Sequence, residues 1–233
     1  MGGMPGRAGK MPPYLPHSAA APTDVPLQTL SHDEYLALRA DAAVIEFDRH
    51  GDKVLMLSDG SYLKLFRRKR LISSAAWYPY AQRFADNALE LAGRRIPCPE
   101  VLGVYRIPGV RREAVRYRPL AGRTLRHIVR SGADTSGLRD KLGRFVARLH
   151  AAGIYFRSLH LGNIVLTPSG EFGLIDIADR RTSSKPIPRH RRLRNLKHLL
   201  RDEQDRTWLH QSDAAAFDRA YNDASGSGTA GRP

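Results

Sequence analysis

Two oxygen-bearing side chains bracket a stretch of the sequence that is typical of a β-hairpin. Asn163 opens a strand-like segment, 163–167, and Asp176 closes a second one, 171–176, with turn residues between them. Because a two-stranded hairpin returns the chain to its starting edge, both side chains can face one ion. Amide and carboxylate oxygens together with water are the ligands that Mg²⁺ prefers. Asn163 and Asp176 are therefore candidate ligands of one cation, although each taken singly is more often an asparagine that caps a strand or an aspartate in a turn.

A lysine far upstream could neutralise phosphate near such a metal. Lys64 lies in the apolar, alternating segment 62–66, where a strand would direct it opposite to its neighbours. A positive charge held there could stabilise phosphate oxygens. Taken alone, Lys64 would more often be an exposed strand lysine, so its assignment to phosphate depends on the hairpin.

The stretch around Asn163 resembles a known catalytic loop. Residues 152–166 and 173–176 are similar to the catalytic loop and metal segment of the protein-kinase-like superfamily, and closest to bacterial lipopolysaccharide core kinases and the related toluene tolerance proteins. Small kinases of this type commonly carry Asp-Leu-His-x-x-Asn-Ile and then Leu-Ile-Asp. The matching residues are Leu159, His160, Asn163, Ile164, Leu174, Ile175 and Asp176. Ser158 stands where the family has its catalytic aspartate, and Ile177-Ala178, not Phe-Gly, follows Asp176.

The resemblance implies a fold and cofactors. The expected fold is α+β and two-lobed, with an N-lobe antiparallel sheet plus one helix and a mainly helical C-lobe with a β-hairpin. The implied cofactors are ATP and Mg²⁺, with Lys64, Asn163 and Asp176 binding the nucleotide and its metal. The segment 117–125 resembles the connection between lobes, which makes Tyr117 and Leu120 candidates for the nucleotide pocket. The helix after Lys64 should supply its carboxylate partner, but Gln82, Asp86 and Glu90 leave that choice open.

Ser158 changes the expected mechanism, because a serine is no base at neutral pH. Three interpretations follow: a slow kinase that relies on metal and positioning, a kinase with another base, or a nucleotide-binding pseudokinase. His160 and Asp179 are the nearest substitutes, so Ser158, His160 and Asp179 form the candidate catalytic set. Alternatively, His160 is a structural hydrogen-bonding group, and Asp179 pairs with the arginines that follow it.

The expected elements divide the chain into a flexible tail at 1–30, an N-lobe at 31–118, a C-lobe at 119–224 and a flexible end at 225–233. In the N-lobe, Ser31 should cap a short helix, three strands near 43–66 should form a meander, and a helix should begin at Pro79. Two strands, 101–106 and 114–117, complete this lobe. In the C-lobe, a helix should begin near Ser136, and the last helix should carry Leu193, Leu196 and Leu200.

The charge is strongly positive and clustered. The net charge is +15; four basic residues occupy 67–70, and nine lie between 180 and 201 without an acidic residue. Such clusters favour an anionic glycolipid or membrane surface as partner. Nucleic acid is disfavoured because the second cluster has no aromatic side chain to stack on bases. Cys98 is the single cysteine, which excludes an internal disulfide. We therefore expect a cytoplasmic protein, peripheral at the inner face of the cell membrane.

Two functions follow from these features. The first is an ATP-dependent phosphotransferase of the lipopolysaccharide-core-kinase type that acts on a sugar hydroxyl of an envelope glycolipid; the sugar substrate rests on the resemblance. The second, suggested by Ser158, is a pseudokinase-like regulatory protein that binds nucleotide or lipid.

Overall fold

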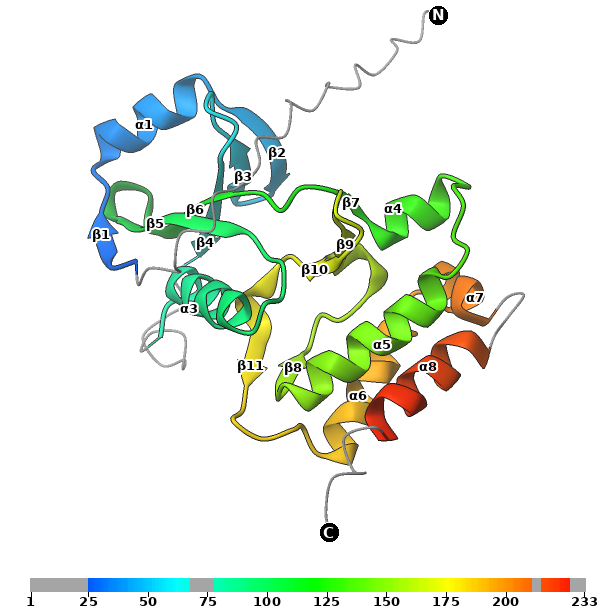
Figure 1. Ribbon diagram of the computed structural model, residues 1–233. Helices are drawn as coiled ribbons and strands as arrows, with labels where there is room; N and C mark the ends of the chain where they lie inside the picture. Colours follow the sequence, from blue (N-terminus) through cyan, green and yellow to red (C-terminus); the bar gives the residue numbers. More distant parts are fainter. Residues whose placement is uncertain (1–24, 68–77, 211–214, 227–233) are drawn as a thin grey trace, which may run out of the picture.

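The computed structural model describes residues 25–67, 78–210 and 215–226, which form two lobes joined at residues 119–122 (Figure 1). The N-lobe is built on a six-stranded sheet of order β1-β5-β6-β4-β3-β2. Its strands are β1 (Leu27–Thr29), β2 (Ala43–Asp48), β3 (Gly51–Met56), β4 (Tyr62–Arg67), β5 (Glu100–Ile107) and β6 (Arg112–Arg118). The pairs β2–β3, β3–β4, β4–β6 and β5–β6 are antiparallel, which confirms the predicted meander.

The sheet differs from expectation at one edge. Strand β1 pairs in parallel with β5, and Leu30 after it is buried, so residues 27–30 belong to the N-lobe and not to a flexible tail. The backbone of these residues satisfies the open edge of β5, an interaction that their composition does not reveal. The rest of the expected tail, 1–24, and part of the basic run at 67–70 lie outside the described residues.

Both helices that the sequence predicts for this lobe are present beside the sheet, including the short one at Ser31 in addition to the single N-lobe helix that the family resemblance implies. Helix α1 (His32–Ala40) begins with the predicted cap, in which Ser31 and Glu34 form a capping box. It packs with Leu63 and Leu65 into a small apolar cluster. Helix α3 (Tyr80–Gly93) joins a larger cluster that continues into the C-lobe.

The C-lobe contains the predicted hairpin and more helices than expected. Strands β9 (Ile164–Leu166) and β10 (Phe172–Leu174) pair antiparallel, and β7 (Arg123–Thr124) joins β9. A second small sheet pairs β8 (Ile154–Phe156) with β11 (Arg180–Thr182). The remaining elements are α4 (Leu125–Arg130), α5 (Leu138–Ala151), η2 (Leu161–Asn163), η3 (Ile177–Asp179), α6 (Arg189–Leu199), α7 (Glu203–His210) and α8 (Ala215–Gly226).

The expectation that α6 is the last helix was wrong. Helix α8 lies along α5 (Figure 1), and the contact is close at Gly143, where an added Cβ would lie 2.4 Å from the backbone oxygen of Phe217. Trp208 and Phe217 join the larger core, which explains why this polar-looking end of the chain is helical. Helix α8 also runs past the expected boundary at 224, and residues 227–233 lie outside the described part.

Among the helices of the described ranges, none combines the length and apolarity that crossing a bilayer requires.

A glycine after α5 makes the turn into β8 possible, and this generates a stability prediction. Gly153 has φ of +75°, and an added Cβ would lie 2.1 Å from the backbone oxygen of Ser183. Gly60 has φ of +78° but open space around it, so it is the matched control. Both alanine variants lose about 1–2 kcal/mol to the left-handed backbone, and Gly153→Ala should lose about 2 kcal/mol more to the clash. Thermal unfolding should show a melting temperature for Gly153→Ala about 4–8 °C below that of Gly60→Ala; equal values would contradict the packing described here.

Candidate functional site

The predicted phosphate-binding lysine and the metal-segment aspartate are brought together across the two lobes. Lys64 Nζ lies 2.5 Å from Asp176 Oδ1, with side chains 18% and 51% exposed. Lys64 points away from the cluster that holds Leu63 and Leu65, as the strand alternation predicts. The lobes therefore meet at a charged pair that solvent reaches.

Helix α3 was expected to provide the carboxylate partner of Lys64, and among the described residues it does not. Glu90 instead lies 3.3 Å from Arg180, and Asp86 accepts a hydrogen bond from Gln82 at 2.9 Å. Helix α3 is attached to the metal segment in a different way, because Asn87 Nδ2 donates to the backbone oxygen of Ile177 at 2.6 Å.

Asn163 is buried beside Asp176 and its amide is oriented. Its Nδ2 donates to the backbone oxygen of Ser158 at 2.9 Å, so its Oδ1 remains as a free acceptor. The Ile175 N–H donates to the backbone oxygen of Asn163 at 3.0 Å, which places Asp176 one residue from this contact. Asp176 itself has φ of +53°, a left-handed conformation that is costly for a residue with a side chain. The backbone thus aims the carboxylate.

These two residues fit a hard divalent cation. One amide oxygen and one carboxylate are the donor set that Mg²⁺ accepts when water and phosphate oxygens complete its shell. Within the described residues no group of three or more His, Cys, Asp or Glu side chains could hold a metal ion. Asn163 and Asp176 would therefore hold such an ion only together with ligands from the nucleotide and solvent.

The two residues proposed for the nucleotide pocket lie where the lobes join. The Tyr117 ring packs at 5.8 Å from Tyr62 and 5.1 Å from Phe84, and burial raises the pKa of its hydroxyl. Leu120 lies against Gly173 of β10, since an added Cβ at Gly173 would be 2.5 Å from Leu120 Cδ2. Both side chains are partly exposed apolar groups at the seam between the N-lobe sheet and the hairpin.

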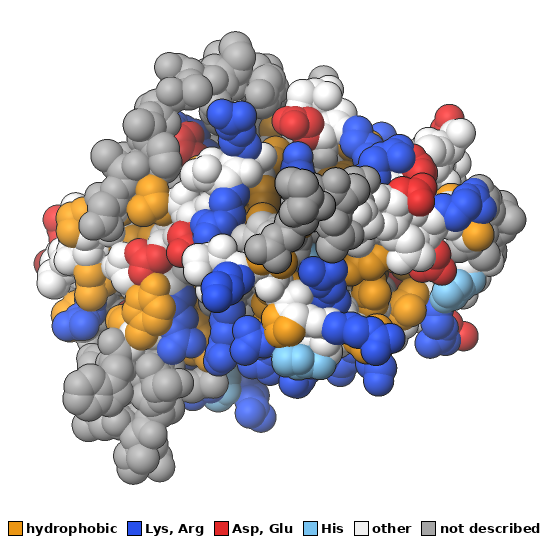
Figure 2. Space-filling view, turned by 60° about the horizontal axis from the view of Figure 1, so that its bottom comes forward, with side chains coloured by type: hydrophobic (Ala, Val, Ile, Leu, Met, Phe, Trp, Pro, Cys, Tyr) orange, Lys and Arg blue, Asp and Glu red, His pale blue; other side chains and the backbone are white. Residues whose placement is uncertain are grey.

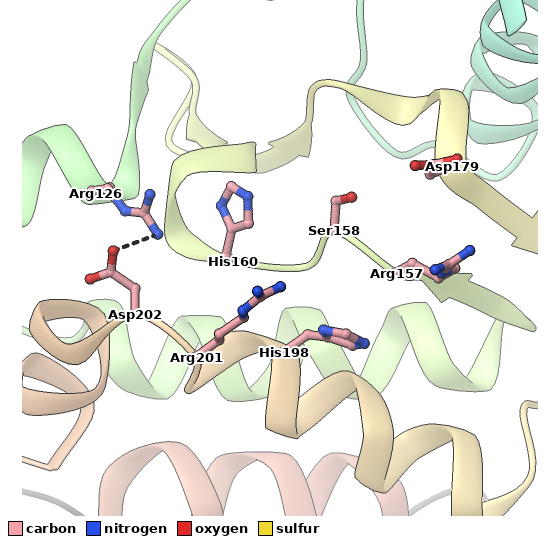
Figure 3. A pocket seen from close by; sticks show the side chains of 8 residues that line it. All are labelled: Arg126, Arg157, Ser158, His160, Asp179, His198, Arg201 and Asp202. Atoms are coloured by element: carbon pink, nitrogen blue, oxygen red, sulfur yellow. Dashed lines mark ion pairs between the residues drawn. The ribbon is translucent and has the colours of Figure 1, made fainter.

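A cavity of about 530 Å³ opens next to the catalytic loop (Figure 3). Its lining residues are Arg126, Arg157, Ser158, His160, Asp179, His198, Arg201 and Asp202. The three candidate catalytic residues therefore share one cavity, with Ser158 between His160 and Asp179 in Figure 3. The described residues include no ion pair to Asp179, and Arg180 turns inward to the backbone oxygen of Asn87 at 2.8 Å. The alternative in which Asp179 pairs with Arg180 and Arg181 is therefore not observed among the described residues.

His160 is half-buried, and its surroundings disfavour the charged form of the imidazole. Burial lowers its pKa below the usual value, and the neighbouring Arg126 lowers it further. Its Nδ1 is buried without a hydrogen-bond partner in the described part of the chain. The Cα of Gly162 approaches this ring so closely that an added Cβ would be 3.1 Å from Nδ1.

The catalytic loop is held by residues that the sequence analysis did not identify. Asp205 of α7 is 1% exposed and accepts from Arg126 Nε at 3.0 Å and from the Leu161 N–H at 3.3 Å. Asn195 of α6 is buried and donates to the backbone oxygen of Phe156 at 2.7 Å, just before the loop. In sequence these residues look like ordinary polar positions of two surface helices, and only the fold shows that they point inward.

The family profile and the sequence relatives agree on one family. The sequence profile of the lipopolysaccharide kinase (Kdo/WaaP) family matches residues 124–221. A 3-deoxy-D-manno-octulosonic acid kinase of Stenotrophomonas maltophilia is 33% identical over 189 residues, which cover 72% of this chain and 74% of that protein. One from Xanthomonas campestris pv. campestris is 27% identical over 225 residues, 78% of this chain and 88% of that protein. Among solved structures, the bifunctional kinase-methyltransferase WbdD matches with a TM-score of 0.37 and 16% identity over 57% of this chain and 29% of its own.

The contribution of the buried carboxylate of Asp205 to stability can be compared with that of the more exposed carboxylate of Asp202. Asp205→Asn removes the charge that balances Arg126 in a buried position and should cost about 3 kcal/mol of unfolding free energy. Asp202→Asn is the matched control: Asp202 is 30% exposed, lies 3.4 Å from the same arginine, and should cost less than about 1 kcal/mol. Urea unfolding of both variants measures the difference. Equal losses would mean that burial does not set the strength of this anchor.

Proposed function

This chain belongs to the lipopolysaccharide kinase (Kdo/WaaP) family, and we propose that it transfers the terminal phosphoryl group of ATP to a sugar hydroxyl of an envelope glycolipid. Its relatives are named 3-deoxy-D-manno-octulosonic acid kinases, so a hydroxyl of this sugar acid is the proposed acceptor. The observation that supports the proposal best is the convergence of Lys64, Asp176 and Asn163 beside the cavity that contains Ser158. The regulatory alternative is not favoured, because these relatives, matched over most of the chain, are named as kinases.

Each of the three residues has a proposed part in binding ATP. Lys64 would neutralise phosphate oxygens, and Asn163 and Asp176 would hold Mg²⁺, which when bound would supply positive charge that stabilises the phosphates. When ATP and its metal bind, the ion pair between Lys64 and Asp176 must break. The ammonium then contacts phosphate, and the carboxylate contacts the metal. Tyr117 and Leu120 offer apolar surface to the base at the join of the lobes.

We assign the role of general base to Asp179. It is an exposed carboxylate on the wall of the cavity, free of an ion pair among the described residues, so it can approach an incoming hydroxyl. Ser158 donates or accepts a hydrogen bond to orient that hydroxyl. His160, half-buried and packed against Gly162 and Arg126, serves as a positioning residue that shapes the loop.

A peripheral position at an anionic membrane surface is part of the same proposal. Helix α6 carries exposed Arg189, Arg191, Arg194 and Lys197, and Figure 2 views the molecule from the end where α6 lies, with Lys and Arg side chains spread over this face. An acceptor embedded in an anionic surface would approach such a face with favourable electrostatics, at about 1 kcal/mol per basic residue near the membrane.

Nucleotide binding is tested without knowledge of the acceptor. Saturating Mg²⁺ and ATP, at about 100 times the dissociation constant, should stabilise the protein by about 2.7 kcal/mol and raise the melting temperature by about 5–10 °C. Asp176→Ala should abolish this shift, whereas Asp41→Ala, an exposed aspartate after α1, should retain it. A full shift in Asp176→Ala would refute the metal assignment.

The assignment of Asp179 as the general base is tested by removing its carboxylate and then placing one at position 158. Asp179→Asn should lower kcat for phosphoryl transfer about 10²–10⁴-fold. Adding Ser158→Asp to that variant should recover part of the loss, because it returns a carboxylate to the loop. A steady-state assay with 3-deoxy-D-manno-octulosonic acid glycolipid measures both. If Asp179→Asn keeps its rate while His160→Gln loses it, the histidine and not the aspartate is the base.

A further inference from the structure

The positive charges around the cavity are not equally balanced. Arg126 is neutralised by Asp205 at 2.5 Å and Asp202 at 3.4 Å. Arg157 and Arg201 line the same cavity, and the described residues contain no ion pair to either guanidinium. Two exposed guanidinium groups thus face the cavity without a carboxylate partner in the described part of the chain.

These two arginines come from different elements and approach the same loop. Arg157 directly precedes Ser158 after β8, and Arg201 follows the end of α6. Figure 3 shows Arg201 reaching toward the segment that carries Ser158 and His160, with His198 of α6 beside it. His198 lies close to these positive charges. Burial lowers its pKa, and the charges of Arg194, Arg201 and Arg157 lower the pKa further. Its Nε2 is buried and without a hydrogen-bond partner in the described part of the chain.

A concave site with unpaired guanidinium groups suits a carboxylate or a phosphate, because the planar fork of arginine matches the two oxygens of such groups. The nucleotide is assigned to Lys64, Asn163 and Asp176, and none of these three is among the residues that line the cavity. An anion bound at the arginines therefore belongs to the other substrate.

We propose that Arg157 and Arg201 form an acceptor subsite, which binds an anionic group of the sugar substrate and thereby orients its hydroxyl beside Ser158. This inference rests on the proposed phosphotransfer and names the part of the site that selects the acceptor. The carboxylate of the sugar acid and a phosphate elsewhere on the glycolipid share the required chemistry.

Kinetics of Arg157→Gln, Arg201→Gln and the double variant test the subsite. Each single change should raise KM for the acceptor glycolipid about 10- to 100-fold, because a hydrogen bond to a charged group is lost, while KM for ATP stays within about twofold. Arg201→Lys should recover part of the loss. Arg206→Gln removes the same charge from an exposed position of α7, outside both the cavity and the basic face of α6, and should leave the acceptor KM unchanged. A rise in KM for ATP instead, or an equal effect of Arg206→Gln, would overturn the proposal.

Modified acceptors identify the anion and separate this inference from the proposed activity. Wild-type protein should bind the methyl ester of the sugar acid more weakly if the carboxylate is recognised, or the dephosphorylated glycolipid more weakly if the phosphate is. Undiminished binding of both neutralised acceptors would overturn the subsite. Titration calorimetry without ATP gives these affinities directly. If no phosphate is transferred but binding still depends on Arg157 and Arg201, the subsite stands and the proposed reaction fails.

Discussion

The ion pair between Lys64 and Asp176 is the interaction on which the site depends, because it is where the sheet of one lobe meets the metal segment of the other. Its strength is limited: with the carboxylate 51% exposed, the pair is worth about 0–1 kcal/mol. A weak pair suits this position, since the proposed phosphate and metal ligands would have to replace it without a large cost. The conformation of residues 175–177 is set separately, by the left-handed backbone of Asp176 and the Asn87–Ile177 hydrogen bond, so the pair determines how the two lobes meet.

The loop beside this pair is held by stronger means. Asp205 of helix α7 is fully buried and accepts hydrogen bonds from Arg126 and the Leu161 N–H. Asn195 of α6 donates a hydrogen bond to Phe156 in the strand before the loop. Breaking a buried ion pair costs several kcal/mol, in contrast to an exposed one. The protein therefore combines a rigid loop with an exchangeable charged pair. This combination is expected of a site that must keep its reacting groups in register while nucleotide and metal enter and leave.

The parts of the site that could be predicted from sequence are those with a local signal. The hairpin between Asn163 and Asp176 follows from its turn residues, and the direction of Lys64 follows from strand alternation; both are present in the structure. The anchors could not be predicted in this way, since Asp205 and Asn195 act through elements distant in sequence, and a polar residue on a helix looks the same whether it faces water or the core. Strand β1 and helix α8 were missed for the same reason: their partners, β5 and α5, are specified by tertiary contact.

Ser158 and the arginines beside it are best understood together. A carboxylate at position 158 would lie within the cavity that Arg157 and Arg201 line, and it would neutralise the charge proposed to bind the acceptor. Serine leaves that positive charge available. It also removes a general base, which typically accelerates the reaction about 10²–10⁴-fold. Holding the acceptor hydroxyl in an attacking position can offset a loss of this size, because well-oriented groups gain about 7–11 kcal/mol over free ones. Under the proposed function, the serine at position 158 would leave the proton-accepting role to Asp179 on the cavity wall, and the loop itself would hold an anionic sugar.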